Sequence, residues 1–318
     1  MTPSSSTDTM MALRSHTRGG PENLVYEAAP LPAPTASQVR VAVDAASLTF
    51  TELSWDETWE RNGKSRAPII PSHEYAGVIA ELGADVDGWS VGQRVYGLIP
   101  FDVDGAAADF VCVEATDLAL APTSASPIEA AATPLAALTA WQAFVDHGDL
   151  KSGQQLLIHG AAGGVGIFAV QLAKHFGANV TATARAADLD FVRHLGADVV
   201  IDFETEAFDA GGAQFDLILD MAGGDTLARS IAVTRRGGRV ISVNSPPPAD
   251  LAAEHGVNAM FFIVEPNPAE LVGIAGLIDS GELRVIVART FPVADGRLAF
   301  EYGETHGRAP GKTVLVVH

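Results

Sequence analysis

The feature that most constrains this chain is an apolar run that breaks into glycines and then continues with helical spacing. Residues Leu156–His159 form the run, and Gly160–Gly166 supply the glycine-rich turn. Apolar residues then recur at the spacing of one helix face up to Gly177, and a glycine is typical of a helix end. A strand, a glycine turn and a helix in this order predict a βαβ unit and therefore a parallel sheet.

The glycines of this turn have the spacing of a dinucleotide-binding fingerprint, with Ala161 in place of its first glycine. Gly163 would let the backbone approach a pyrophosphate, and Gly166 would let the helix pack close to the strand. The N–H groups at the helix start attract the anion. The sequence therefore predicts cofactor contacts from Ala161, Gly163, Gly164 and Val165. The alternative is a flexible loop, but strand, loop, helix and next strand appear in register here.

The end of the second strand indicates which dinucleotide would bind. An acidic residue about 20 positions after the fingerprint would hold a ribose 2′-hydroxyl, and the stretch 180–187 contains none. It offers threonine hydroxyls, including that of Thr183, and the guanidinium of Arg185. A charge-assisted contact to a 2′-phosphate contributes roughly 1.5–3 kcal/mol. We therefore predict NADPH rather than NADH; the alternative for Arg185 is a solvated surface arginine.

Further apolar runs alternate with helical patterns, which is typical of a parallel sheet covered by helices. Counting the first run, the chain has six, the number of strands in a complete doubly wound dinucleotide fold. The runs are Gln155–His159, Asn179–Ala184, Val199–Asp202, Phe215–Asp220, Arg239–Val243 and Met260–Val264. A helix is expected at Pro268–Ile278, and short strands that end in Thr313–Val317 follow it.

The chain before this region has a different pattern. Val39, Val41 and Val43 alternate with other residues, the period expected of a half-buried strand. More short strand candidates follow, separated by glycines, and predict a small β-barrel or sandwich. They are Tyr75–Ala80, Arg94–Leu98 and Asp109–Val113.

We therefore expect an α/β protein in which a Rossmann domain and a β-barrel share the chain. Residues 1–127 would begin the barrel, with residues 1–20 frayed because they are rich in Ser and Thr. Residues 128–266 would form the nucleotide-binding domain. Residues 267–318 are long enough to return to the barrel and close it.

Charge and composition narrow the partners. The 318 residues contain 20 Lys and Arg against 39 Asp and Glu, a net charge of −19 that disfavours nucleic acid and anionic membrane surfaces. No apolar stretch reaches the roughly 18 residues of a membrane span. The single cysteine, Cys112, cannot form an intramolecular disulfide or a four-cysteine zinc lobe, which suggests a cytoplasmic protein.

Together these stretches resemble the medium-chain dehydrogenase/reductase superfamily, in its zinc-independent quinone oxidoreductase and enoyl reductase branch. The resemblance runs from about Pro21 to His318. It implies a chaperonin-10-like barrel interrupted by a Rossmann domain, a bound cofactor, and a homodimer formed through the edge strand of the Rossmann sheet. The matching stretches are Pro71–Val78, Val91–Gly97, Pro134–Trp141, His159–Gly166, Leu195–Asp198 and Gly237–Arg239.

The resemblance also implies cofactor contacts outside the glycine turn. Thr139 matches a threonine near the nicotinamide, and Asn244 would lie beside the nicotinamide ribose. Lys312 matches a C-terminal lysine whose charge would lie over the cofactor. Phe203 replaces a tyrosine that often follows the third strand, so a phenol contact to the 2′-phosphate is lost. The backbone facing the carboxamide would be that of Phe261, Phe262 and Ile263; for the two phenylalanines, the core of a subunit-pairing edge strand is an equal alternative.

A metal site must be weighed because His73 and Glu74 match the pair that helps to hold catalytic zinc in alcohol dehydrogenases. A catalytic zinc needs three protein ligands. Thr49 stands at the position of the first cysteine in those relatives, and the second falls near Leu135. Two of three ligands are therefore missing, and we predict no metal.

Without a Lewis acid, the easier chemistry is hydride delivery from NADPH to a quinone or to an alkene already polarised by a carbonyl. By family position, Thr49, His73 and Tyr96 are the candidate catalytic residues, and Trp55 would also line the substrate site. For Trp55 and Tyr96, the alternative is packing within the barrel. The main alternative is a non-catalytic NADPH-binding redox sensor or scaffold. A Rossmann-like methyltransferase would share the glycine loop, but the preceding barrel and the six-strand pattern argue against it.

Overall fold

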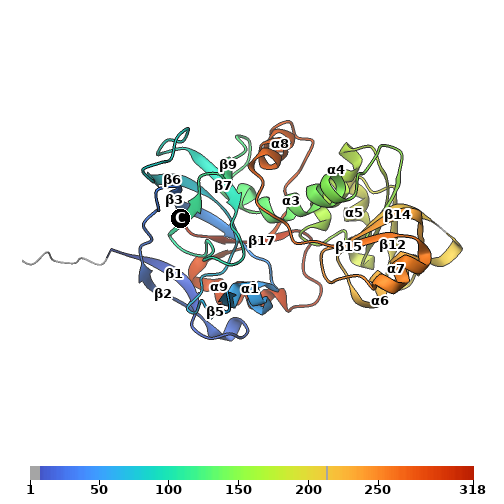
Figure 1. The fold of residues 1–318 in the computed structure, drawn as a ribbon, viewed down its shortest axis with the longest axis horizontal. Helices are drawn as coiled ribbons and strands as arrows, with labels where there is room; N and C mark the ends of the chain where they lie inside the picture. Colours follow the sequence, from blue (N-terminus) through green and yellow to red (C-terminus); the bar gives the residue numbers. More distant parts are fainter. Residues whose placement is uncertain (1–7, 213) are drawn as a thin grey trace, which may run out of the picture. The chain divides into compact units, whose positions relative to one another are not determined.

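The computed structural model describes residues 8–212 and 214–318, and the chain divides into two compact units (Figure 1). The first unit takes in the chain up to Leu135 together with Glu265–Asp279 and Val285–His318. The second comprises Ala136–Val264 and Ser280–Arg284. The barrel unit is thus assembled from both ends of the chain, and the nucleotide-binding unit from its middle.

The first unit contains a seven-stranded sheet that is antiparallel except for its β16–β17 pair. Its strand order is β16-β17-β3-β6-β7-β9, and β8 pairs with β3. Val39, Val41 and Val43 are fully buried in its core, as the period-two pattern predicted. The strands are β3 (Gln38–Ser47), β6 (Glu74–Leu82), β7 (Arg94–Leu98), β8 (Phe110–Glu114), β9 (Leu118–Leu120), β16 (Val287–Pro292) and β17 (Lys312–Val316).

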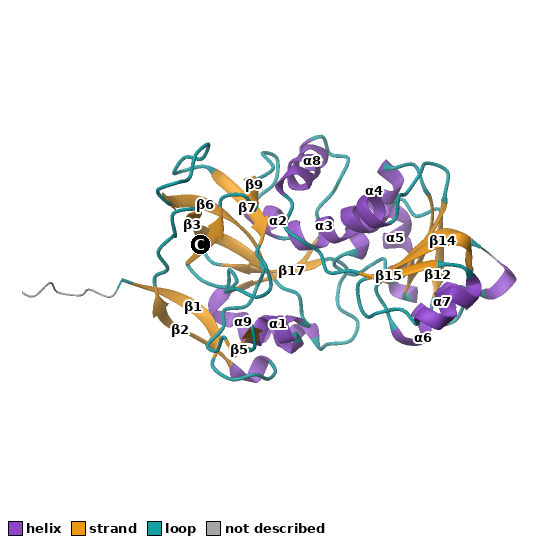
Figure 2. Ribbon diagram, in the orientation of Figure 1, coloured by secondary structure: helices purple, strands orange, loops and turns teal. Residues whose placement is uncertain are grey.

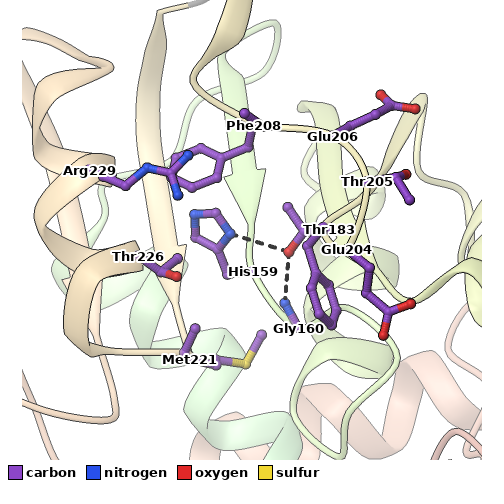
Figure 3. A pocket seen from close by; sticks show the side chains of 13 residues that line it. His159, Gly160, Thr183, Glu204, Thr205, Glu206, Phe208, Met221, Thr226 and Arg229 are labelled. Atoms are coloured by element: carbon purple, nitrogen blue, oxygen red, sulfur yellow. Dashed lines mark hydrogen bonds between the residues drawn. The ribbon is translucent and has the colours of Figure 1, made fainter.

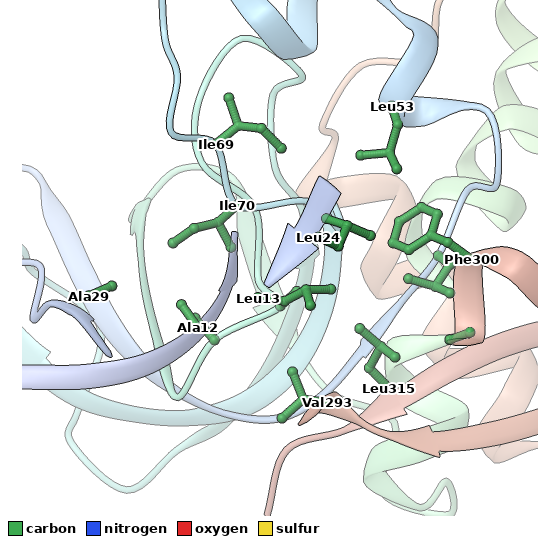
Figure 4. Packing of buried hydrophobic residues seen from close by; sticks show 14 of the residues in the cluster. Ala12, Leu13, Leu24, Ala29, Leu53, Ile69, Ile70, Val293, Phe300 and Leu315 are labelled. Atoms are coloured by element: carbon green, nitrogen blue, oxygen red, sulfur yellow. The ribbon is translucent and has the colours of Figure 1, made fainter. Parts of the chain in front are cut away.

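The N-terminal region differs from the expectation that residues 1–20 are frayed. Residues 1–7 lie outside the described part of the chain, but β1 (Thr9–Ser15) pairs antiparallel with β2 (Leu24–Pro30). Leu13 is 1% exposed and belongs to a core cluster that includes Leu24 and Phe300 (Figure 4). The burial of this strand depends on α9 (Gly296–Gly303), which lies near the other end of the chain, so the sequence around the strand does not reveal it.

Short helices and a small hairpin complete the first unit (Figure 2). The Ser126 and Glu129 side chains close a reciprocal capping box at the start of α2. Helix α3 begins in this unit and continues beyond Leu135 into the second. The elements are α1 (Asp56–Trp59), β4 (Glu60–Arg61), β5 (Lys64–Ser65), α2 (Pro127–Ala131), α3 (Pro134–Gln142), α8 (Pro268–Asp279) and α9 (Gly296–Gly303).

The second unit is a six-stranded parallel sheet with order β12-β11-β10-β13-β14-β15, the doubly wound Rossmann arrangement. The six predicted strands are confirmed, with two changes of bounds: β14 begins at Thr234, before the predicted Arg239, and β15 begins before the predicted Met260 and ends at Phe261. The strands are β10 (Gln155–Ile158), β11 (Asn179–Ala184), β12 (Val199–Asp202), β13 (Phe215–Asp220), β14 (Thr234–Ser242) and β15 (Asn258–Phe261). The helices are α4 (Gly166–His175), α5 (Leu189–Leu195), α6 (Gly224–Ala232) and α7 (Ala249–His255). Across residues 8–212 and 214–318, no helix combines the length and apolar character needed to cross a bilayer.

Candidate functional site

The glycine-rich turn connects β10 to α4 and folds back on itself. Gly160 has a left-handed φ of 73°, which glycine adopts without strain. Its carbonyl oxygen accepts a hydrogen bond from the Gly163 N–H at 3.0 Å. A Cβ on Gly166 would collide with that carbonyl and lie 2.6 Å from backbone atoms of Ala161. Only glycine therefore lets α4 begin this close to the strand.

The start of α4 is suited to an anion. Its N-cap is Val165, and no side chain of the described residues caps the first turn of this ten-residue helix. The N–H groups of Ile167 and Ala169 already donate to the carbonyls of Gly163 and Val165, so an anion would meet the N–H groups that precede them, those of 164–166. At Gly163 a Cβ would meet only the Gly160 oxygen, at 3.2 Å, so the space on this side of the turn is open. With the buried Ala161 beneath them, Gly163, Gly164 and Val165 form a turn that fits a pyrophosphate.

A pocket of about 580 Å³ adjoins this turn (Figure 3). It lies where β10, β11, β12 and β13 end, the edge at which doubly wound sheets bind ligands. Four of its lining residues, His159, Gly160, Thr183 and Phe203, belong to the stretches that the sequence singles out. The other lining residues were not expected, although several directly follow β12 or β13 and could have been found from that position. They are Glu204, Thr205, Glu206, Ala207, Phe208, Met221, Ala222, Thr226 and Arg229.

Two residues assigned to a 2′-phosphate already have protein partners. Thr183 is 3% exposed, and its hydroxyl lies 3.2 Å from the Gly160 nitrogen and 3.2 Å from His159 Nδ1. Arg185 places Nε 2.8 Å and Nη2 2.5 Å from one carboxylate oxygen of Asp188. Thr183 therefore anchors the turn, and a 2′-phosphate would have to share Arg185 with Asp188.

The residues expected at the nicotinamide end all belong to the second unit, apart from Lys312. Thr139 is buried in α3, and Asn244 is exposed just after β14. Phe261 is half-buried in β15, whereas Ile263 is 51% exposed beyond it. Phe262 is buried, with its ring centroid 4.5 Å from that of His147, so its side chain serves the core.

Two residues of the first unit that were expected at the site have partners within that unit. Tyr96 is fully buried in β7, and its hydroxyl donates to the Leu271 carbonyl of α8 at 2.5 Å. Burial raises the pKa of this phenol above its ordinary value, which makes it a poor proton donor to substrate. The ammonium of Lys312 pairs with Glu74 in the interior, so it is not a free cation for a cofactor.

A buried polar cluster lies around the other two substrate-side candidates. The Glu52 carboxyl accepts from the Ser72 N–H at 2.9 Å and from the Thr49 N–H at 3.4 Å, and lies 3.8 Å from His73 Nε2. Among the described residues, the Ser72 hydroxyl and both ring nitrogens of His73 have no hydrogen-bond partner of good geometry. The His73 ring instead contacts the edge of Phe101 at 5.3 Å.

Burial sets the protonation of this cluster. It raises the pKa of Glu52 to about 8, because removing the carboxylate from water outweighs the two backbone hydrogen bonds. It lowers the pKa of His73 to about 3, and the nearby Arg66 charge acts in the same direction. Near neutral pH the pair is therefore a protonated acid beside a neutral imidazole.

The residues do not fit a catalytic zinc. Within residues 8–212 and 214–318, no three His, Cys, Asp or Glu side chains are grouped as a metal ion would require. Glu74 next to His73 is committed to Lys312 and to the Leu135 N–H, from which it accepts at 3.1 Å. Burial raises the pKa of Cys112 to about 11, so this residue remains a thiol.

Comparisons with known proteins agree with the two-unit fold. Residues 35–123 match the alcohol dehydrogenase GroES-like domain, and residues 195–315 match a family described as zinc-binding dehydrogenase. The structure of the quinone oxidoreductase from Coxiella burnetii superposes with a TM-score of 0.91 and 30% identity, covering 98% of this chain and 100% of that one. The chain belongs to the medium-chain dehydrogenase/reductase superfamily.

Some of the relatives carry reductase or oxidoreductase names, and others are polyketide synthase proteins. The 2-methylene-furan-3-one reductase of Solanum lycopersicum is 33% identical over 87% of this chain and 71% of its own length. The spectinabilin polyketide synthase system protein NorB of Streptomyces orinoci is 36% identical over 91% of this chain, but the chain spans only 13% of that protein. Others are named NAD(P)H oxidoreductase. As a member of the superfamily, the protein is an oxidoreductase that uses a nicotinamide cofactor.

Proposed function

We propose that the protein transfers hydride from NADPH to a quinone or to the alkene of an α,β-unsaturated carbonyl compound, without a metal. The observation that carries this proposal is the uncapped glycine turn at the start of α4, beside a pocket at the ends of the parallel strands. Reductase and quinone oxidoreductase names among the relatives support the reaction class.

NADPH is favoured because no acid ends β11. Ala184 is its last residue, and Arg185 follows with a side chain 32% exposed. An acid at that position would repel a 2′-phosphate, and an arginine can bind one. The partner of Arg185, Asp188, is only 7% exposed and offsets part of this preference. We therefore expect a moderate preference for NADPH over NADH.

The chemistry divides between cofactor and protein. A bound nicotinamide supplies the hydride. The turn from Ala161 to Val165 holds the pyrophosphate, and hydrogen bonds from the N–H groups of Gly160 and Ala161 to Thr183 attach the turn to β11. Since the donor set fits no Lewis-acid metal, the substrate must be polarised already, as enones and quinones are. Thr49 and His73 remain our proposed substrate-side residues, with Glu52 retaining a proton 3.8 Å from His73.

We further propose a homodimer formed through β15. This strand ends the six-stranded sheet, so one of its edges is left without a partner strand in the described chain. Ile263 adds an apolar side chain, 51% exposed, just beyond it. Light scattering should give twice the chain mass, and Ile263→Asp should give monomers. Leu298→Asp, which changes a similarly exposed residue on α9, is the matched control.

The reaction is tested by mixing the purified protein with NADPH and a panel of quinones and 2-alkenals and following cofactor absorbance. Deuterium at the transferable position of NADPH should appear on the β-carbon of a reduced enone. Gly163→Val, which fills the open side of the turn, should abolish turnover. Tight NADPH binding with no oxidation across the panel would contradict the proposal and support the non-catalytic sensor.

A further inference from the structure

A chain of hydrogen bonds passes through His159, at the end of β10, and fixes where its proton lies. The Ser230 hydroxyl donates to the Thr226 carbonyl of the same helix, α6, at 2.7 Å. That hydroxyl has only one proton, so it can only accept from His159 Nε2, 3.0 Å away. Nε2 therefore carries the ring proton.

The other ring nitrogen connects to the cofactor turn (Figure 3). A neutral imidazole has one N–H, so Nδ1 is an acceptor. The Thr183 hydroxyl, 3.2 Å away, donates to it and in turn accepts from the Gly160 N–H at 3.2 Å. The series of hydrogen bonds thus connects Gly160, the first residue of the turn, through Thr183 of β11 and His159 to helix α6. Each donor in the series has an acceptor.

The surroundings keep the imidazole of His159 uncharged. Its side chain is buried, and the ring of Phe208 stands edge-on against it at 4.5 Å between centroids. The Arg229 guanidinium covers Phe208 at 4.8 Å and pairs with Asp209. Burial, and then the Arg229 charge, lower the pKa of His159 to about 4. The imidazole therefore keeps one donor and one acceptor at neutral pH.

We propose that His159, as the neutral Nε2–H tautomer, is a positioning residue that holds the glycine turn in its pyrophosphate-binding conformation. The proposal rests on the proposed function only in taking a dinucleotide as the ligand. The Ala161 N–H already attaches the turn to β11 by donating to the Thr183 carbonyl at 3.0 Å. Holding the Gly160 N–H adds a second attachment, at the peptide next to the carbonyl that accepts from Gly163, and so fixes the orientation of the turn.

The anchor can be distinguished from a contact to the 2′-phosphate by its effect on the two cofactors. NADPH and NADH share the pyrophosphate, so loss of the anchor should weaken both equally. Thr183→Val keeps the shape of the side chain but removes the hydroxyl, and should raise the dissociation constants of both cofactors about tenfold or more. Thr183→Ser keeps the hydroxyl and should restore most of the affinity. An effect on NADPH alone would overturn the proposal.

Histidine variants separate positioning from stability. His159→Gln retains a donor that can reach Ser230 but has no acceptor at the Nδ1 position, so it should weaken both cofactors as Thr183→Val does. The matched control is His194→Gln, which changes an exposed histidine on α5 and should leave both dissociation constants unchanged. A His159 variant that unfolds at lower temperature yet binds both cofactors normally would show a purely structural role.

The tautomer can be observed without any substitution. Nitrogen-15 correlation spectra of the labelled, cofactor-free protein should show His159 protonated at Nε2 and bare at Nδ1 at pH 7. A proton at Nδ1, or a charged ring, would overturn the assignment. The binding and tautomer measurements require no turnover, so a failure to reduce quinones or enones would leave the positioning role intact. Unchanged cofactor binding in the Thr183 and His159 variants would contradict the positioning role alone.

Discussion

Glu74 and Lys312 form an ion pair in the interior of the barrel unit and join β6 to β17. The two side chains are 1% and 5% exposed, and the pair lies 238 residues apart in sequence. Lys312 Nζ also lies 3.4 Å from the Leu48 carbonyl oxygen, while Glu74 accepts from the Leu135 N–H. Through this ion pair and its hydrogen bonds, β17 is attached to β6, to the segment at Leu48 and to the start of α3.

Removing one charge of this pair should be costly. Lys312→Met leaves a buried carboxylate without its partner and should lower the free energy of unfolding by about 3–5 kcal/mol. Urea titration measures the loss, and the double variant Glu74→Gln/Lys312→Met should recover much of it. If Lys312 instead served the cofactor, the single variant would keep its stability and lose NADPH affinity.

The choice between NADPH and NADH should depend on the Arg185–Asp188 pair. Arg185→Ala should reduce the ratio of NADPH to NADH affinity about tenfold, and Asp188→Asn should increase it by removing a competing carboxylate. Isothermal titration with both cofactors gives the ratios. Arg193→Ala removes an exposed arginine paired with Asp190 on α5 and should change neither. An unchanged ratio in Arg185→Ala would make that residue a surface arginine.

Gly163 and Gly166 should respond differently to the same substitution. Alanine at 166 collides with the Gly160 and Ala161 backbone, so Gly166→Ala should lower the melting temperature of the cofactor-free protein by several degrees. Alanine at 163 meets one atom at 3.2 Å, so Gly163→Ala should leave the cofactor-free protein nearly as stable but weaken NADPH binding. Equal melting temperatures for the two variants would contradict this interpretation of the turn.

The elements that the sequence predicted best are those encoded locally. Alternating valines in β3 and the apolar runs of the Rossmann sheet carry their own period, and the residue types that the glycine turn requires all lie within one short stretch of chain. The fold class and the position of the glycine turn could therefore be predicted from the amino-acid sequence alone.

The contacts that the sequence did not predict mostly involve partners distant in sequence. Nothing around Lys312 indicates Glu74, and nothing around Tyr96 indicates the Leu271 carbonyl, 175 residues away. The prediction that residues 1–20 are frayed rested on their Ser- and Thr-rich composition. The packing of β1 against α9 is a tertiary contact that this composition does not indicate. The Arg185–Asp188 pair spans only three residues, but its formation depends on the backbone after β11.

The Glu52 carboxyl should make stability depend on pH. Its pKa rises from 4.5 to about 8 on folding, so the folded protein keeps a proton that the unfolded chain releases between these values. Stability therefore falls as the pH rises from about 4.5 to 8, by up to about 5 kcal/mol. Glu52→Gln should remove this slope in urea titrations at pH 5, 6.5 and 8.

His73 gives the free energy of unfolding a pH dependence of the opposite sign, which the same experiment must separate from that of Glu52. Its pKa is lowered to about 3, so its contribution is lost as the pH falls below about 6.5, in both proteins alike. The difference between the wild type and Glu52→Gln therefore isolates the carboxyl. A difference that is constant with pH would show that Glu52 is ionised in the folded protein.

Substitution of Tyr96 tests whether its hydroxyl stabilises the fold or donates a proton in the reaction. Its O–H donates to the Leu271 carbonyl at 2.5 Å and so attaches α8 to β7. Tyr96→Phe should lower the free energy of unfolding by about 1–2 kcal/mol, because the buried carbonyl loses its donor. The kcat and its pH profile should not change, since the phenol faces backbone and not substrate. A fall in kcat with unchanged stability would support Tyr96 as a proton donor. It would contradict a structural role for its hydrogen bond to Leu271.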